Sequence, residues 1–189
     1  MLLRHLAGSL TRLWLGYGIG AMAGLAAGVS VRGRAWALVD ALMGVPTMVW
    51  VPVLMVAFGP GAEAVVAAVA LGAVFVVAKS TAAAVASVDE DVAGAARLDG
   101  ASGWRLAVLV LFPAAWPGVS SGLRLGVGYA WRALVGAEIA AALLRWGLGR
   151  LIWDARLLGD YGAMYAGLAA IAVCGAVFDR LLGGIVRVE

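Results

Sequence analysis

Residues 62–105 read AEAVVAAVALGAVFVVAKSTAAAVASVDEDVAGAARLDGASGWR, an apolar run followed by a stretch with clustered charge. The apolar part, at about 62–78, is long enough to predict a helix that crosses a membrane. A strand of a membrane β-barrel would alternate apolar and polar residues, and this run does not alternate. The stretch therefore predicts an all-α membrane protein with a polar segment at about 87–105 between apolar helices.

The composition of the 189-residue chain supports the same class. Hydrophobic residues make up 64% and charged residues only 13%, so a soluble domain would lack the polar residues to cover its surface. Intrinsic disorder is excluded because it requires low hydrophobicity and high charge. The net charge of +3 is typical of arginines in the loops of a membrane protein, so we expect lipid contacts and no nucleic-acid partner.

Further apolar runs on both sides predict a polytopic protein with about five transmembrane helices in a single domain over residues 1–189. The expected bounds of the spans are about 13–31, 36–58, 62–78, 113–143 and 162–182. Pro46 and Pro52 are expected to bend the second span, because proline removes a backbone hydrogen bond. Residues 144–161 are amphipathic, with Arg and Trp, and predict a helix on the outer membrane surface.

The placement of Arg and Lys predicts the orientation of the chain in the membrane. More of them fall on the side of the polar segment, which favours a cytoplasmic polar segment and C-terminus and an outside N-terminus. No cleavable signal peptide is expected, since residues 1–10 contain no sufficient apolar run with a cleavage motif after it. Cys174 is the single cysteine, so we expect no internal disulfide bond.

Two rows of glycines recur at intervals of four residues in the first and fourth spans. They are Gly16, Gly20, Gly24 and Gly28, and then Gly118, Gly122 and Gly126. Small residues at this interval form a groove that lets another helix backbone approach closely. The rows predict close helix packing, either within the chain or in a dimer.

The polar segment has the signals of two short helices. Ser87 and Glu90 have the spacing of a capping box, which predicts a helix from Ser87 to about Leu98. Gly100 fits a left-handed residue after that helix, and Ser102 can cap a second short helix. On these residues alone, a compact two-helix projection and a solvated connecting loop are equally good interpretations.

The polar segment and the span after it resemble a known family. Residues 94–102, Trp104-Arg105 and 111–113 resemble the EAA loop of ABC-importer permeases, with Gly94 in place of the usual glutamate. Other segments are similar to the nitrate, sulfonate, taurine and bicarbonate branch of these permeases: 113–117, 121–126, Ala130-Trp131, Ala137-Glu138 and 147–156. The resemblance implies the type I ABC importer permease fold, and we expect the chain to lack the first helix of six-span relatives.

In that family the EAA loop is the coupling helix, which docks on a cytoplasmic ATPase. The resemblance therefore implies a permease subunit that forms the path of an ATP-driven importer for a small solute, such as nitrate, a sulfonate or taurine. The partners that it implies are a second permease subunit (the same chain or a paralogue), two ABC ATPase subunits and an extracytoplasmic substrate-binding protein, in the bacterial inner membrane. The residues expected at the ATPase are Asp91, Gly94, Ala95, Ala96, Arg97, Gly100, Ala101, Ser102 and Trp104.

Ionisable residues inside a span are candidates for the translocation path, because charge at that depth usually faces a cavity or a partner group. The candidate path residues are Arg132, Glu138, Trp131, Trp50 and Met48. A structural ion pair remains the alternative for the charged residues, and core packing for the others. The face expected to meet the binding protein comprises Gly147, Gly149, Arg150, Asp154 and Arg156.

Catalysis by this chain is not expected. The nearest approach to a phosphate-binding loop, Ala78-Lys79-Ser80, lacks the required glycines, so ATP and Mg²⁺ are expected on the partner ATPase and no cofactor on this chain. His5 is the single histidine, and no metal cluster or nucleophile–base pair is predicted. Two other functions stay open: a vitamin-capturing membrane component that binds its substrate directly, and a membrane scaffold that transports nothing.

Overall fold

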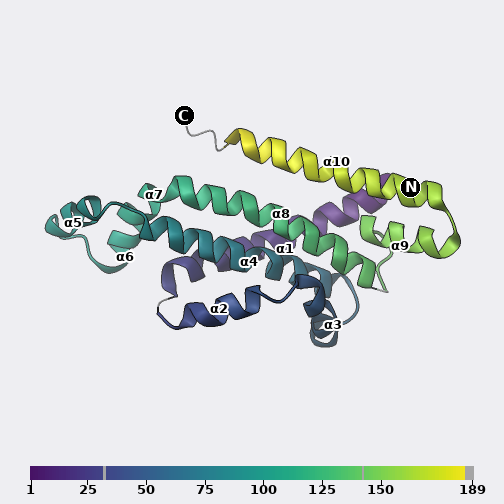
Figure 1. Ribbon diagram of the computed structural model, residues 1–189, viewed down its shortest axis with the longest axis horizontal. Coiled ribbons are helices and arrows are strands. Elements are labelled where there is room, and N and C mark those ends of the chain that lie inside the picture. The colour runs from purple at the N-terminus through teal and green to yellow at the C-terminus, as the bar shows by residue number, and fades with distance from the viewer. Residues whose placement is uncertain (32, 142, 186–189) are drawn as a thin grey trace.

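The computed structural model describes residues 1–31, 33–141 and 143–185, and it is an elongated bundle of helices (Figure 1). This described part of the chain contains no strand, which confirms the all-α prediction. In chain order the helices are α1 (Leu2–Ser30), α2 (Ala35–Met43), α3 (Thr47–Phe58), α4 (Ala62–Ala86), α5 (Glu90–Leu98), α6 (Gly103–Leu106), the π-helical turn η1 (Ala107–Leu111), α7 (Phe112–Ala114), α8 (Trp116–Ala140), α9 (Leu148–Leu158) and α10 (Tyr161–Ile185).

Helix α4 packs between α1 and α8 along most of its length. Both predicted glycine rows face it, so the close packing that they predict is confirmed inside the chain. A Cβ atom at Gly24 of α1 would lie 2.7 Å from Cβ of Val77, and one at Gly126 of α8 would lie 2.7 Å from Cγ2 of the same valine. The two helices therefore approach α4 at a separation that larger residues would not allow.

The chain bends sharply at two places, within the predicted second span and at the start of the predicted fourth span. Helices α2 and α3 meet at 99°, and the segment from Gly103 to Ala114 meets α8 at 76°. Pro46 immediately precedes α3, and Pro117 lies in the first turn of α8, positions at which proline begins a helix without losing a hydrogen bond. Within the described residues, three helices are long and apolar enough to span a membrane alone, or up to five if each bent pair counts as one span.

The bounds of several spans differ from the sequence predictions. Helix α1 begins at Leu2 rather than near residue 13, and α4 continues to Ala86 rather than ending near 78. The first prediction was wrong because three of the polar side chains that mark residues 5–12 as non-membrane, those of His5, Ser9 and Arg12, pack against α8 or the loop before α9. The amphipathic segment contains α9, after which Gly159 adopts a left-handed conformation with φ +71°.

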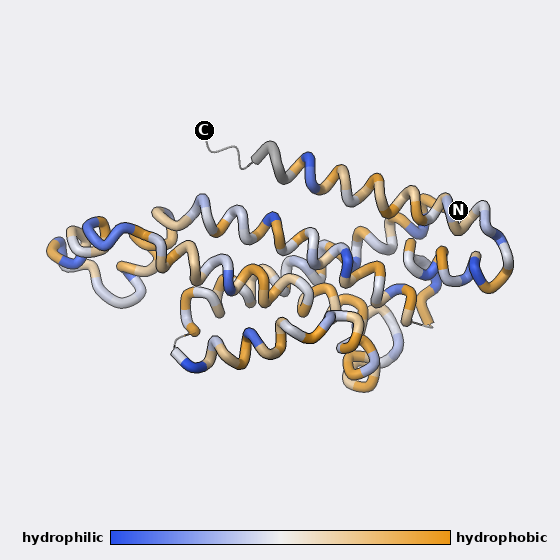
Figure 2. The backbone as a smooth tube through the Cα atoms, in the orientation of Figure 1, coloured by the Kyte–Doolittle hydropathy of each residue, from blue (hydrophilic) through white to orange (hydrophobic). Residues whose placement is uncertain are grey.

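Hydrophilic residues gather at the two ends of the bundle (Figure 2). Helices α5 and α6 project at one end, and α9 lies at the opposite end, next to the N-terminus (Figure 1). The apolar core between them consists mainly of α4 and α8 residues, together with Leu13 of α1, Val51 of α3 and Leu148 of α9. The fold therefore separates the two polar regions by the length of the long helices.

Candidate functional site

The first helix of the polar projection begins at a different residue from the one predicted. The Asp89 carboxylate accepts a hydrogen bond from the Asp91 backbone N–H at 2.9 Å and caps α5. Ser87 instead donates its hydroxyl to the Ala84 carbonyl oxygen at 2.8 Å, at the end of α4. The predicted capping box on Ser87 is therefore wrong, because the preceding helix uses this side chain.

The end of α5 follows the prediction. Helix α5 ends at Leu98, and Gly100 has a φ of +86°, the left-handed conformation that glycine adopts without strain. The Ala101 N–H donates to the Ala96 carbonyl oxygen at 2.9 Å, which closes the C-terminus of the helix. Ser102 precedes α6 as expected, although its side chain makes no capping hydrogen bond. The segment is thus a compact two-helix projection.

The projection exposes apolar side chains at its tip. Leu98 is 91% exposed and Trp104 is 68% exposed, although both are large and hydrophobic. Of the predicted ATPase-contact residues, Gly94, Ala96 and Ala101 are half-buried, and the others are exposed: Asp91, Ala95, Arg97, Gly100, Ser102 and Trp104. Leu98 was missed as a contact residue, although a large apolar residue in the last turn of an otherwise polar helix indicates a contact surface. Exposed apolar groups of this kind mark protein contact surfaces.

A cavity of about 410 Å³ lies where the broken span of α2 and α3 meets α4 and α8. Three predicted path residues line it together: Met48, Trp50 and Arg132. The Arg132 guanidinium lies 5.6 Å from the centre of the Tyr129 ring, a cation–π contact. The Trp50 indole N–H is buried and has no hydrogen-bond partner in the described part of the chain. The cavity thus combines mainly apolar walls with the cation of Arg132.

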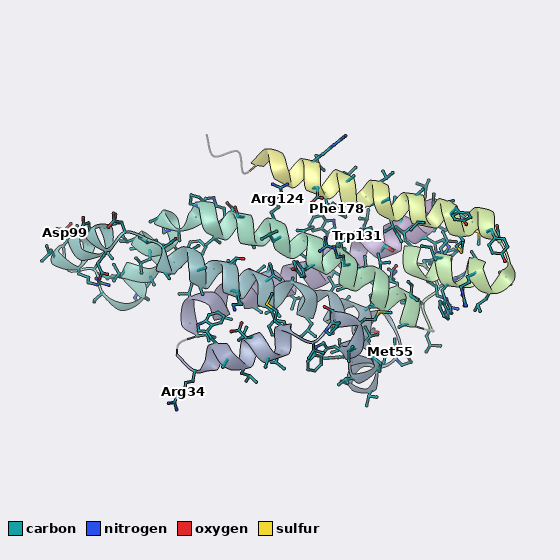
Figure 3. All side chains as sticks on the ribbon, in the orientation of Figure 1. Arg34, Met55, Asp99, Arg124, Trp131 and Phe178 are labelled. Carbon is teal, nitrogen blue, oxygen red and sulfur yellow. The ribbon has the colours of Figure 1, made fainter. Side chains whose placement is uncertain are left out.

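Arg132 also borders a hollow of about 320 Å³ on the side of α8 that faces α10. Arg124, which lines the same hollow, donates to the Asp179 backbone oxygen at 3.2 Å and points from α8 toward α10 (Figure 3). Trp131 is buried against Phe178, with ring centres 5.2 Å apart (Figure 3), and together with Arg124 and Arg132 it lines a second hollow of about 390 Å³ between α8 and α10. Arg124 was missed as a path candidate, although it is an arginine inside the predicted fourth span.

Among the described residues, Glu138 lines neither the cavity beside α3 nor the hollows between α8 and α10. Its side chain is fully buried and accepts hydrogen bonds from Arg12 at 2.6 Å, from Ser9 at 2.8 Å and from the Gly149 N–H at 3.0 Å. In this structure Glu138 therefore forms the interhelical ion pair that the sequence left open as an alternative. Arg12 and Ser9 were missed because they lie 126 and 129 positions away along the chain.

Only part of the predicted binding-protein face lies on the surface of the protein. Gly147 and Gly149 are buried against Glu138, so these two do not form a surface, and that part of the prediction is corrected. Arg150 and Asp154 form a partly exposed ion pair at 2.7 Å one turn apart on α9. Arg156 is exposed and stacks on Trp153 at 5.1 Å. The outer surface of α9 thus carries both signs of charge.

Comparisons with known proteins agree on a single family. Residues 16–187 match the family described as binding-protein-dependent transport system inner membrane component. The chain is 31% identical over 190 residues to the taurine transport system permease protein TauC of Escherichia coli (strain K12), covering 97% of this chain and 68% of that protein. It is 30% identical to the bicarbonate transport system permease protein CmpB of Synechococcus elongatus, covering 95% of this chain and 66% of that protein. The chain thus spans about two thirds of the length of these relatives.

Solved structures resemble the fold across nearly the whole chain. An inward-facing structure of the MetNI methionine ABC transporter aligns with a TM-score of 0.76 and 20% identity, covering 98% of this chain and 93% of that one. An amino acid ABC transporter crystallised with histidines aligns with a TM-score of 0.79 and 20% identity, covering 98% and 92%. At this identity the likeness establishes the fold alone, and it confirms the expected ABC importer permease architecture.

Proposed function

The chain belongs to the family of binding-protein-dependent transport system inner membrane components, and we propose that it is the membrane-spanning permease subunit of an ATP-driven importer. The observation that carries this proposal is the two-helix projection of α5 and α6, with Leu98 and Trp104 exposed at one end of the bundle. Helix α5 is capped by Asp89 and closed at Gly100, and a well-defined helix of this kind is better suited than a flexible loop to transmit a push to the long helices.

The partners follow from the two polar ends of the bundle. ATPase subunits, which carry ATP and Mg²⁺, dock on the projection of α5 and α6, and this end faces the cytoplasm of a bacterial cell. The extracytoplasmic binding protein docks at the opposite end, where α9 exposes Arg156 and the Arg150–Asp154 pair. A second permease subunit, identical or paralogous, completes the path. The C-terminus is then cytoplasmic and the N-terminus lies outside.

The cargo is a small anion. Arg132 is exposed to two spaces within the span of α8, and a charged group at that depth is stable only where water or a polar partner reaches it. A guanidinium binds planar oxyanions through paired hydrogen bonds, and Arg124 lies on the same hollow. Support also comes from the relatives, which are named as permeases for taurine, bicarbonate, nitrate and aliphatic sulfonates.

Co-purification of an ATPase subunit tests the subunit assignment. Replacing residues 95–100 by a Gly/Ser linker, or Leu98 alone by Asp, is expected to abolish ATPase capture, because both changes remove the exposed apolar contact. Leu158→Asp is the matched control, since Leu158 is a leucine exposed to 83% at the end of α9, on the opposite side of the bundle. Undiminished capture by both projection variants would refute the coupling assignment.

Uptake measurements test the path. In a complex that still assembles, Arg132→Gln is expected to lower the uptake of nitrate, bicarbonate or taurine at least tenfold, whichever of them the intact complex carries. The control is Arg145→Gln, because Arg145 is exposed beyond the end of α8 and stacks on Trp146. Unchanged uptake and selectivity in Arg132→Gln would exclude Arg132 from the path.

A further inference from the structure

A polar cluster is buried where α1, α8 and the loop before α9 meet. It comprises Ser9 and Arg12 of α1, Glu138 of α8, and the backbone of residues 146–149. Ser9 and Glu138 are 0% exposed and the Arg12 side chain is 11% exposed. Isolated charges are very unfavourable at such burial, so the pairing of Arg12 with Glu138 must persist in the folded chain.

The cluster supplies the N-terminal cap of α9 from other helices. The N-cap residue, Gly147, has no side chain with which to accept hydrogen bonds from the first amides of α9. The Leu148 N–H donates to Ser9 Oγ at 2.8 Å, and the Gly149 N–H donates to Glu138 Oε2 at 3.0 Å. The carboxylate also lies at the positive end of the α9 dipole, where negative charge is favoured.

The loop before α9 is bound to the cluster by its backbone as well. The Trp146 carbonyl oxygen accepts from Arg12 Nη2 at 2.5 Å, and the Gly147 carbonyl oxygen lies 2.8 Å from Nδ1 of His5. A Cβ at Gly149 would lie 2.9 Å from Cβ of Glu138. The start of α9 is therefore held directly against α8 and α1.

The same end of α8 reaches the cavity. Gly136 lines the cavity two residues before Glu138, and a Cβ at this glycine would lie 2.6 Å from the sulfur of Met48. Arg132 lies one further turn along α8. The junction residue Glu138 and the cavity-lining residues Gly136 and Arg132 thus lie within two turns of one another on the same helix.

We propose that Glu138 and Ser9 are positioning residues that join α9 to the cavity-lining part of α8, so that a protein docking on α9 acts directly on the cavity. This inference rests on the proposed function, in which the binding protein docks on α9. Buried ion pairs contribute little stability relative to apolar residues of equal volume. The cluster is instead suited to specifying how α9 and α8 are oriented.

Amide hydrogen exchange of the full chain in lipid nanodiscs tests this junction. Ser9→Ala removes the acceptor for the Leu148 N–H and one donor to Glu138, and it leaves the ion pair in place. Glu138→Gln keeps one acceptor oxygen and removes the charge. Thr11→Ala is the matched control, because Thr11 is exposed and donates to the Ala7 carbonyl oxygen of its own helix.

Ser9→Ala is expected to accelerate exchange roughly tenfold, the effect of losing a hydrogen bond to a charged group, both in the first turn of α9 and in the cavity segment 43–50. Exchange in residues 65–77 of α4 is expected to stay unchanged, and Thr11→Ala to leave all three segments unchanged. Glu138→Gln also leaves Arg12 without its ion-pair partner, so this variant is expected to accelerate exchange in all three segments, and it is the reference for a general loss of stability.

In Ser9→Ala, faster exchange confined to α9 would show a cap without transmission and would overturn the inference. A similar increase in all three segments of this variant would show a general loss of stability and would also overturn it. Capture of the ATPase is not part of this measurement, so the junction and the proposed function fail separately.

Discussion

Substitution of Gly16 by alanine tests the packing of α1 on α4. A Cβ at this position would lie 2.6 Å from the Val66 carbonyl oxygen and 2.6 Å from Cβ of Val69. Ordinary contact begins at 3.4 Å, so the helices must separate by about 0.8 Å. The Val66 oxygen belongs to the backbone of α4, and no rotamer change can relieve this contact.

Gly18 offers a matched control on the same helix, because no atom lies within 4 Å of a Cβ there. Both substitutions gain the same helix propensity, about 1 kcal/mol, so this contribution cancels when the two variants are compared. The remaining difference is the cost of overpacking, about 1–3 kcal/mol. At roughly 2–4 °C per kcal/mol for a chain of this size, Gly16→Ala should melt roughly 2–12 °C below Gly18→Ala.

Thermal unfolding of the two variants in the same detergent, followed by the loss of helical circular dichroism, measures this difference. The wild-type chain is expected to melt below Gly18→Ala. If Gly16→Ala melted at or above the temperature of Gly18→Ala, the glycine row would not set the separation of α1 and α4, and the packing argument would be refuted.

Three further substitutions test other parts of the structure. Gly94→Ala is expected to stabilise α5 by up to about 1 kcal/mol, because alanine favours a helix and a Cβ at this position meets no atom within 4 Å. Amide exchange in α5 should become slower, and faster exchange would contradict the prediction. Arg12→Ala leaves the buried Glu138 without its ion-pair partner, so it is expected to lower the free energy of unfolding by about 3–5 kcal/mol, measured by denaturant titration. The double variant Arg12→Met with Glu138→Leu leaves no unpaired charge and should recover most of that loss. If the double variant were no more stable than Arg12→Ala, the unpaired charge would not be the cause. Arg150→Ala breaks a partly exposed pair with Asp154 and is expected to cost less than about 1 kcal/mol in the same titration, and a larger loss would contradict this.

Local signals in the sequence were sufficient for much of the polar projection. Gly100 had to adopt a left-handed conformation after a short helix, and the helix ends where that glycine predicted. The N-cap of the helix was predicted at Ser87, two residues before the observed N-cap, Asp89. The reason is that Ser87 can bond to either helix, and only the position of the α4 C-terminus decides between them.

The cavity was predicted only in part. An arginine inside an apolar span usually faces a cavity or a polar partner, so Arg132 could be selected from the sequence as a path candidate. By the same reasoning Arg124 should have been selected. No local pattern distinguishes Arg132 from Glu138, since both are single charges in one span. Their different environments arise from Arg12, which is distant in the sequence and forms an ion pair with Glu138.

Hydropathy, glycine spacing and the motif around Gly100 thus determined the class of protein, the approximate number of spans, the close packing of the two glycine-rich helices and the family, because each depends on residues that are near one another along the chain. The tertiary structure decided which charge faces a cavity and which is neutralised, and how the start of α9 is held against α1 and α8. Those features depend on contacts between side chains more than a hundred residues apart, as in the bonds from Ser9 and Arg12 to Glu138. Such contacts have no periodicity in the sequence, since only the packing of the helices brings the partners together.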